Sequence, residues 1–332
     1  PGCGDWRVEF WLTDLLFVGE VILWVGLLVL KVFAKDCYGA LMRDVRVEAI
    51  HIHPVKSCRR IEVKQAGVIA TGLKHDREWQ IVNEDGECIT QRKHKILATV
   101  ETALDGDTVL LSANGNGSTI LSRQNATEVS VQHLVGRRPV TAVDGGEKAA
   151  KWISELLGER CRFASITSDS DHRPPSSLDL FEQPIAFVDL APVLLTNLAS
   201  LKWLQERALE QFTIERFRPN VIVDAGEPWV EDTWHDMTIG DAELAGEIPW
   251  PRCAVPQINQ DSGERHREPA VVLRAHRWCE EAPELEGNVR NMMEGHGVFG
   301  MACRIGPVGG TIKVGDPLKV HSYREPLLAP PA

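Results

Sequence analysis

Cys253 has a setting that is unusual for a cysteine. It follows Pro251 and Arg252 directly and precedes Pro256 by three residues. The prolines restrict the backbone on both sides, and the adjacent guanidinium favours the thiolate, the form that binds metals or attacks electrophiles. A single cysteine is more often a small, buried, inert apolar residue, so that alternative stays open.

Basic and amide side chains occur where other strands are predicted to begin or end. Lys56 and Ser57 follow one strand, and a lysine beside a hydroxyl can hold a phosphate. Arg218 and Asn220 lie two residues apart before a second strand, so both can offer donors on one side. Arg77 precedes a third strand. Each of these residues could instead be a solvated or ion-paired surface residue. Together with the thiol they suggest a pocket for an anionic, metal-bearing cofactor.

Other sites of known chemistry are weakly indicated. His51 and His53 share one face of a predicted strand and could bind zinc, but no third ligand lies near them in the sequence. There is no P-loop, no GxGxxG segment after a strand and no GxSxG elbow. The eight cysteines form no CxxC pair, which argues against a zinc ribbon or a disulfide scaffold. Most of them are therefore expected to be free thiols in a reducing compartment.

The composition is that of a globular protein. Of its residues, 43% are hydrophobic and 25% are charged. A length of 332 residues suits two modest domains or one large one. The net charge of -11 argues against nucleic-acid binding, because neutralising phosphates requires a basic face.

Residues 1–40 predict a membrane anchor. Residues 11–33 are dominated by Leu, Val, Phe, Trp and Gly and are long enough to cross a bilayer, although Asp14 and Glu20 interrupt them. Lysines and arginines follow this run, so the positive-inside tendency leaves the downstream part in the cytosol. We expect an uncleaved anchor rather than a signal peptide, because no small-residue cleavage site follows. The alternative is a buried amphipathic helix.

Short strands dominate the rest of the chain. Residues 45–55 alternate apolar and polar side chains, which is typical of a strand, and further short runs of this kind follow between turn residues. Helices are predicted at 146–158 and 198–211. The pattern predicts a β-rich α+β fold.

Nine short segments occur in the order in which the MOSC family carries them. They are residues 54–58, 76–79, 90–92, 217–220, 229–234, 239–241, 252–253, 261–263 and 310–317. The chain therefore resembles this family from about residue 45 to about residue 320. Within the family it is most similar to the reductases of N-hydroxylated compounds.

The resemblance implies a fold and a cofactor. A small β-barrel domain at 45–140 would precede a MOSC β-barrel domain at 141–322, behind the anchor. The cofactor would be a molybdenum ion held by the dithiolene of a molybdopterin, with one protein cysteine completing the coordination. By this resemblance Cys253 is the metal ligand and catalytic residue. The residues expected to bind the cofactor are Lys56, Ser57, Arg77, Arg218, Asn220 and Arg252.

The resemblance also implies an activity and partners. The expected reaction is the reduction of amidoximes and hydroxylamines by removal of oxygen at molybdenum. Electrons would come from NADH through a b5-type cytochrome and its reductase. The anchor would hold the protein in the mitochondrial outer membrane with the catalytic part facing the cytosol. The alternatives are a module that binds the cofactor or carries sulfur without N-reductase activity, and a membrane-tethered structural protein.

Three residues depart from the family pattern. Leu190 and Ala191 stand where hydroxyl residues are common, and Pro251 stands where a serine is common. Proline offers neither a hydroxyl nor an N–H group. We expect cofactor contacts at these positions to differ from those of other members.

Overall fold

A computed structural model describes residues 44–124, 126–132, 139–166, 183–280, 287–307 and 310–331. The predicted anchor at 1–40 lies outside these ranges. Over the ranges that are described, no helix combines the length and the apolar character needed to cross a membrane.

Residues 79–166 form two sheets and one long helix. A five-stranded sheet has the order β10 (Glu128–Gln132), β11 (Pro139–Asp144), β12 (Cys161–Ser165), β5 (Trp79–Asn83), β6 (Cys88–Ile89). A three-stranded sheet has the order β7 (Glu101–Asp105), β8 (Thr108–Ala113), β9 (Gly117–Leu121). The 3-10 helix η1 (Lys95–Thr99) and the helix α2 (Glu147–Leu157) complete this part.

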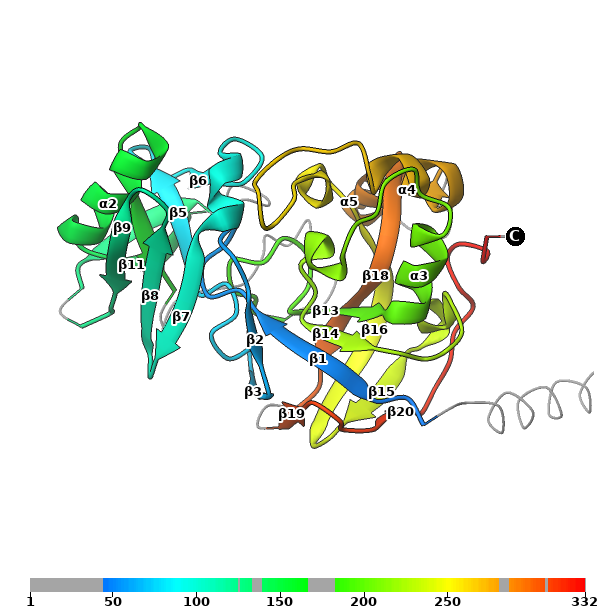
Figure 1. Cartoon of the computed structure of the whole chain (residues 1–332). Helices are drawn as coiled ribbons and strands as arrows, with labels where there is room; N and C mark the ends of the chain where they lie inside the picture. Colours follow the sequence, from blue (N-terminus) through cyan, green and yellow to red (C-terminus); the bar gives the residue numbers. More distant parts are fainter. Residues whose placement is uncertain are drawn as a thin grey trace, which may run out of the picture. The chain divides into compact units, whose positions relative to one another are not determined.

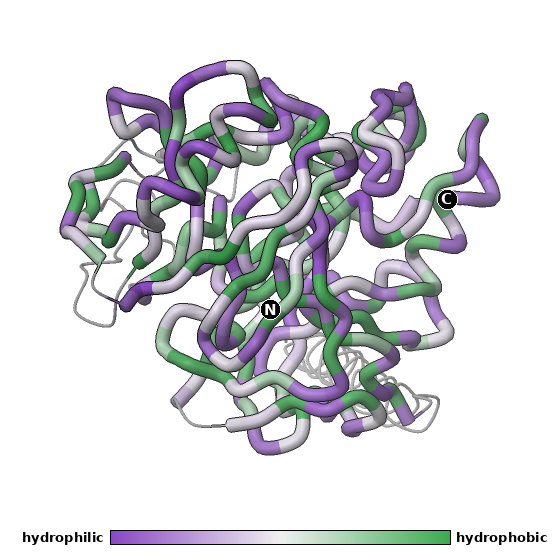
Figure 2. Tube along the Cα trace, turned by 60° about the vertical axis from the view of Figure 1, so that its left-hand side comes forward, coloured by the Kyte–Doolittle hydropathy of each residue, from purple (hydrophilic) through white to green (hydrophobic). Residues whose placement is uncertain are grey.

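Alternation of side chains places one face of each sheet in the interior. In β8, Val109, Leu111 and Ala113 are buried while Leu110 and Ser112 are exposed, as the period of two requires. Figure 2 shows how short hydrophobic and hydrophilic stretches follow one another along the chain. The predicted β-rich character is therefore confirmed.

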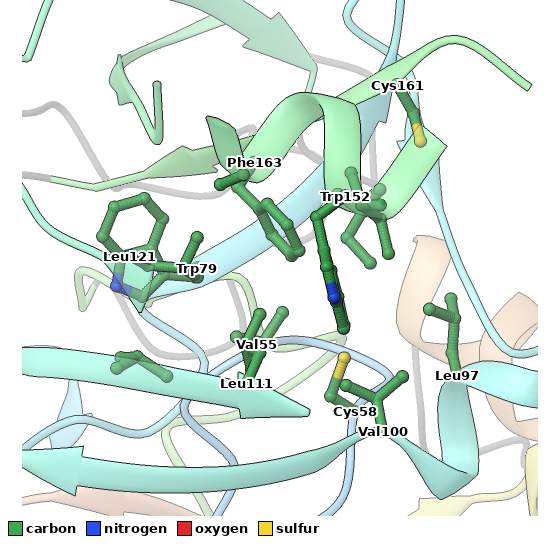
Figure 3. Close-up of a cluster of buried hydrophobic side chains, with 14 of the residues drawn as sticks. Val55, Cys58, Trp79, Leu97, Val100, Leu111, Leu121, Trp152, Cys161 and Phe163 are labelled. Carbon is green, nitrogen blue, oxygen red and sulfur yellow. The ribbon is translucent and has the colours of Figure 1, made fainter. Parts of the chain in front are cut away.

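Helix α2 covers the core between these sheets. Ala149, Trp152 and Ile153 are buried on its inner face, as predicted for 146–158. Gly158 ends the helix in the left-handed conformation at φ 71°, where glycine has no side-chain penalty. Figure 3 shows Trp152 beside Phe163 of β12 in this core, with Trp79, Leu111 and Leu121 from the surrounding strands. The barrel-like packing of strands around one core agrees with the predicted small β-barrel.

A larger sheet dominates the rest of the protein (Figure 1). Its order is β2 (Ile61–Val63), β1 (Val47–Ile52), β14 (Val221–Val223), β13 (Val193–Asn197), β18 (His296–Ile305), β16 (Ala242–Pro251), β15 (Asp236–Ile239), β20 (Leu318–Val320), and β17 (Trp278–Cys279) pairs with β18. A small sheet joins β19 (Thr311–Lys313), β3 (Gln65–Ile69) and β4 (Gly72–Leu73). The described helices here are α3 (Leu198–Gln205), α4 (Ala270–His276) and α5 (Gly287–Met293), with 3-10 turns η3 (Ile214–Phe217), η4 (Val230–Thr233) and η5 (Val255–Gln257).

Two elements differ from their sequence-based predictions. The predicted helix 198–211 ends at Gln205, where the Gln205 side chain donates to the Phe212 carbonyl at 2.6 Å. Phe212 then packs edge-on against Phe217, so tertiary packing ends the helix early. The predicted strand 45–55 is present as β1, but it pairs with β14 of the large sheet.

The expected boundary between residues 140 and 141 falls inside β11. Strand β12 follows that boundary, yet its five residues pair with those of β5. Helix α2 likewise contributes Trp152 to the core that contains Trp79. These contacts join residues up to 165 to the first part of the fold.

Two adjacent carboxylates are buried in η4. Glu231 accepts hydrogen bonds from the Ser200 hydroxyl at 2.6 Å and the Asn197 amide at 2.8 Å. Asp232 pairs with Arg277, and all three ionisable side chains are almost inaccessible. Burial, and then the neighbouring charge of Asp232, raise the pKa of Glu231 to about 7.

This carboxyl gives a pH-dependent stability that can be measured. Burial raises the pKa of Glu231 from 4.5 to about 7. Between these two pH values the folded protein therefore holds a proton that the unfolded chain has released. The stabilisation is present below pH 4.5 and is lost as the pH rises through about 7. We expect Glu231→Gln, which resembles the protonated acid, to flatten this part of the profile of unfolding free energy in urea. Glu155→Gln, at an exposed position, should leave the profile unchanged; equal profiles for Glu231→Gln and the parent would contradict the assignment.

Candidate functional site

A cavity of about 580 Å³ brings together segments that lie far apart in the sequence. Its size lies within the usual range of small-molecule sites, about 300–1,000 Å³. Its lining residues are Lys56, Ser57, Arg77, Thr90, Arg92, Val188, Asp189, Leu190, Leu194, Phe217, Arg218, Trp250, Pro251, Arg252, Cys253, Val255, Asn291, Met292 and His296. Six of the seven residues selected from the sequence are among them.

Backbone pairing places Lys56 and Ser57 next to the segment that contains Arg77. The loop after β1 runs beside β5: the Lys56 N–H donates to the Trp79 carbonyl at 2.7 Å, and the Arg77 N–H donates to the His53 carbonyl at 2.7 Å. The Lys56 ammonium donates to the Phe187 carbonyl at 2.6 Å and pairs with Asp189.

The short turn η3 delivers Arg218 to the cavity. Arg218 follows η3 in the left-handed conformation at φ 56°, and its carbonyl accepts a hydrogen bond from Arg77 at 2.8 Å. Its Nη1 donates to the Gln260 side chain at 3.1 Å. The buried Nη2 of Arg218 has no hydrogen-bond partner in the described part of the chain.

Asn220 lies behind the cavity wall. It is almost fully buried, and its Oδ1 accepts from the Leu194 N–H at 3.1 Å and from Arg77 Nη1 at 3.2 Å. Its Nδ2 donates to the His51 carbonyl at 3.2 Å. The structure thus places this residue as a support for Arg77 rather than in the lining.

Cys253 follows the end of β16, where the sheet stops. Of the cysteines in the described ranges, it is the exposed one. The preceding Arg252 is fixed at both ends, since its N–H donates to the Gly297 carbonyl at 2.8 Å and its Nη2 to the Phe217 carbonyl at 2.7 Å. The thiol is therefore presented to the cavity from a rigid strand end.

Positive charge is concentrated in this cavity. Lys56, Arg77, Arg92, Arg218 and Arg252 all line it, and among the described residues Asp189 is the one carboxylate in the lining. Burial, and then the charge of Arg77, lower the pKa of Arg218 to about 9. Burial likewise lowers the pKa of Arg252 to about 10. Taken out of water, these guanidinium groups favour an anionic ligand.

Unused donors point to the same kind of ligand. Besides Arg218 Nη2, the buried Nε and Nη1 atoms of Arg252 have no hydrogen-bond partner among the residues described. Buried donors without partners are unfavourable unless a ligand accepts from them. Phosphate and heterocycle acceptors would satisfy these atoms, so the donor set fits an anionic pterin-type group.

Backbone strain is also concentrated here. Ser57 at φ 72°, Arg77 at φ 52° and Arg218 at φ 56° all adopt the left-handed conformation, which is uncommon for residues other than glycine. Such residues tend to cluster at ligand-binding and catalytic sites, where the surrounding fold holds them in place. Their convergence on one cavity supports a functional role for it.

The departures from the family pattern have structural explanations. Leu190 and Ala191 are buried in an apolar cluster with Ile248 and Val298, and Leu190 also lines the cavity. Pro251 lines the cavity and pairs with Val298 in the sheet. The cavity lining is therefore apolar at Leu190 and Pro251, where the family pattern has hydroxyl groups.

The alternative zinc site is not formed in the described ranges, where no three His, Cys, Asp or Glu side chains are grouped as metal ligands. Burial lowers the pKa of His51 to about 4 and that of His53 well below its usual value. His53 lies against Asp76, with its Nδ1 atom 3.4 Å from the carboxylate. Both imidazoles are therefore held neutral inside the fold.

Sequence reasoning did not select several lining residues. Thr90 and Arg92 lie in the segment 90–92, which carries part of the family resemblance, but neither was selected as a binding residue. Asp189 directly precedes the noted Leu190, so its position could have been inferred. No sequence signal indicated Trp250, Asn291, Met292 or His296, which reach the cavity through the fold alone.

Two family models match the chain. One describes a MOSC N-terminal beta barrel domain and covers residues 44–160. The other describes a MOSC domain and covers residues 182–319. Together they span both parts of the fold that contribute to the cavity.

Three relatives illustrate the range of similar proteins. Mitochondrial amidoxime-reducing component 1 of Homo sapiens is 31% identical over 282 residues, which cover 82% of each chain. Mitochondrial amidoxime reducing component 2 of Rattus norvegicus is 29% identical over 285 residues, again 82% of each. Molybdenum cofactor sulfurase of Drosophila melanogaster is 35% identical over 232 residues, which are 67% of this chain and 29% of the sulfurase.

Proposed function

Because this chain belongs to the MOSC-domain family, we propose that it is a molybdenum-cofactor-dependent reductase of N-hydroxylated compounds such as amidoximes and hydroxylamines. The observation that carries this proposal is the cavity itself. It combines one exposed thiol, Cys253, with five cationic side chains and with buried guanidinium donors that lack partners within the described ranges. Such a site suits an anionic cofactor that carries a thiolate-binding metal.

The residues divide into a cofactor side and a substrate side. Lys56, Ser57, Arg77, Arg218 and Arg252 would hold the phosphate and the ring by charge and hydrogen bonds, with Asn220 supporting Arg77. Cys253 would be the protein ligand to the metal. The apolar lining residues Leu190, Trp250, Val255 and Met292 would receive the hydrocarbon part of a substrate.

The reaction converts an N–OH group to N–H and consumes two electrons and two protons, releasing water. When bound, the molybdenum cofactor supplies the electrons and accepts the oxygen. The protein would contribute orientation and a positively charged surrounding. The many fixed donors of the cavity require little rearrangement when charge develops, which favours the reaction.

Metal analysis combined with an assay tests this proposal. Protein produced in a host that makes the molybdenum cofactor should retain stoichiometric molybdenum after gel filtration. It should then reduce benzamidoxime to benzamidine with a chemical electron donor. Bound molybdenum without N-reduction would instead favour a cofactor or sulfur carrier, and a protein without molybdenum would overturn both.

We extend the proposal to the partners and the location. The relatives named above as mitochondrial support a mitochondrial location. By extension we propose that residues 1–40 attach the protein to the mitochondrial outer membrane with the cavity facing the cytosol, and that a b5-type cytochrome and its reductase deliver electrons from NADH. Cell fractionation of the full chain and reconstitution with these electron carriers test the two parts separately. A diffuse distribution of the protein would contradict the first part.

A further inference from the structure

Two buried glutamines connect the walls of the cavity. Gln91 follows β6 and Gln260 lies in the loop after η5, 169 positions apart in the sequence. Gln91 Nε2 donates to Gln260 Oε1 at 3.1 Å, and Gln260 Nε2 donates back to Gln91 Oε1 at 3.3 Å. Both side chains are buried, so this reciprocal amide pair is shielded from competing water.

Gln91 holds Ser57 through two contacts. Its Nε2 donates to the Ser57 carbonyl at 2.6 Å, and its backbone N–H donates to the Ser57 hydroxyl at 3.1 Å. Ser57 has a left-handed backbone that is unfavourable for a serine unless its surroundings hold it. Gln91 therefore maintains the conformation of a residue that lines the cavity.

Gln260 holds Arg218 in the same way from the other side. Its Oε1 accepts from Arg218 Nη1 at 3.1 Å, while its Nε2 also donates to the Ile258 carbonyl at 3.0 Å. This contact holds the guanidinium of a residue that lines the cavity, and its buried Nη2 atom lacks a partner over the described ranges. Every donor and acceptor of the two amides is then in use.

We propose that Gln91 and Gln260 are a positioning pair, which presets Ser57 and Arg218 for the anionic group bound in this cavity. The inference deepens the proposed function and rests on it for the identity of the ligand as a molybdopterin. Neither glutamine lines the cavity, and their side chains contact the lining residues Ser57 and Arg218. Its loss should therefore weaken ligand retention by about tenfold or more, as is typical when residues that orient ligand-binding groups are removed.

The variants Gln91→Ala, Gln260→Ala and the double variant test the pair, with Gln80→Ala as the matched control. Gln80 is an equally buried glutamine of β5 whose Nε2 donates to the Gln132 carbonyl at 3.2 Å, and it does not line the cavity. All four substitutions should lower the melting temperature of the cofactor-free protein. Only those at Gln91 and Gln260 should accelerate the loss of molybdenum and pterin during dialysis.

Gln260→Glu changes the charge beside Arg218 at nearly constant side-chain size. A carboxylate still accepts from Arg218 and Gln91, but it cannot donate to the Ile258 carbonyl or to Gln91 Oε1, so the cofactor-free protein should melt below the temperature of the parent, as is also expected of Gln80→Ala. It would also neutralise Arg218, so retention of molybdenum and pterin should fall further than in Gln80→Ala. The second readout is the rise in melting temperature of the cofactor-free protein with inorganic phosphate, which should shrink in the Gln91 and Gln260 variants but not in Gln80→Ala.

The outcomes distinguish this inference from the proposed function. The two single alanine variants should be non-additive in ligand retention, because each breaks the same pair. Unchanged retention and phosphate response, or changes that merely parallel those of Gln80→Ala, would overturn the positioning role even if the parent holds molybdenum. A parent without molybdenum whose phosphate response still depends on the pair would overturn the proposed function alone. No phosphate response and no molybdenum would overturn both.

Discussion

Replacing Cys253 with alanine is expected to abolish N-reduction while leaving the fold intact. The thiol is exposed and makes no core contact, so its removal should change the unfolding free energy by no more than about 0.5 kcal/mol. As the proposed protein ligand of the metal, however, it is the one cysteine among the described residues that lines the cavity. We expect the rate with benzamidoxime to fall by at least about 100-fold, the scale seen when one essential group is removed from a site.

A graded variant and a control sharpen this test. Cys253→Ser keeps the size of the side chain but offers a harder oxygen, which suits this metal less well than a thiolate, so low residual activity is expected. Cys88→Ala removes a half-buried thiol that does not line the cavity, and it should keep full activity. Molybdenum content, reduction rate and melting temperature are measured on each protein. Full activity in Cys253→Ala would rule out the proposed role of this residue.

The second large effect is expected on stability, at the buried pair of Asp232 and Arg277. Both side chains are almost inaccessible, and the Arg277 guanidinium also lies 4.3 Å from the centre of the Trp229 ring. Asp232→Ala would leave this cation buried without its counter-charge. We expect the unfolding free energy in urea to fall by about 3–5 kcal/mol, as when one partner of a buried ion pair is removed.

A double variant distinguishes an unpaired charge from a lost contact. Asp232→Leu combined with Arg277→Met removes both charges and fills much of the space, so it should be less destabilised than Asp232→Ala. Lys151→Ala breaks an exposed pair with Glu155 and should change stability by no more than about 0.5 kcal/mol. If Asp232→Ala lost less than about 1 kcal/mol, the pair would not have the importance that its burial indicates.

The ion pair of Asp232 and Arg277 also affects the candidate functional site. It anchors η4 to the residue that precedes β17, and β17 pairs with β18 beside the end of β16. Strand β16 ends at Pro251, directly before Arg252 and Cys253. Loosening this region should therefore lower the activity of Asp232→Ala at temperatures below its unfolding transition.

Local patterns in the sequence were sufficient to predict several secondary-structure elements. The alternation at 45–55 predicted β1, and the apolar face and Gly158 predicted α2, because both depend on neighbours within a few residues. The prolines and the arginine beside Cys253 set this cysteine apart by the same local reasoning, and among the described cysteines it is the exposed one. The end of α3 was not found in this way, because the chain leaves the helix at Gln205 and packs Phe212 against Phe217.

The composition of the site was determined by the sequence, but its geometry was decided by the tertiary structure. Lys56, Arg77, Arg218 and Cys253 could each have been a surface residue. The strand order β1-β14-β13-β18-β16 brings the segments of Lys56, Arg218 and Cys253 to one cavity, and the hydrogen bond from the Arg77 N–H to the His53 carbonyl adds Arg77. That pairing also turned Asn220 inward to hold Arg77. Which buried donor meets which acceptor depends on contacts across more than a hundred residues, and no local pattern encodes them.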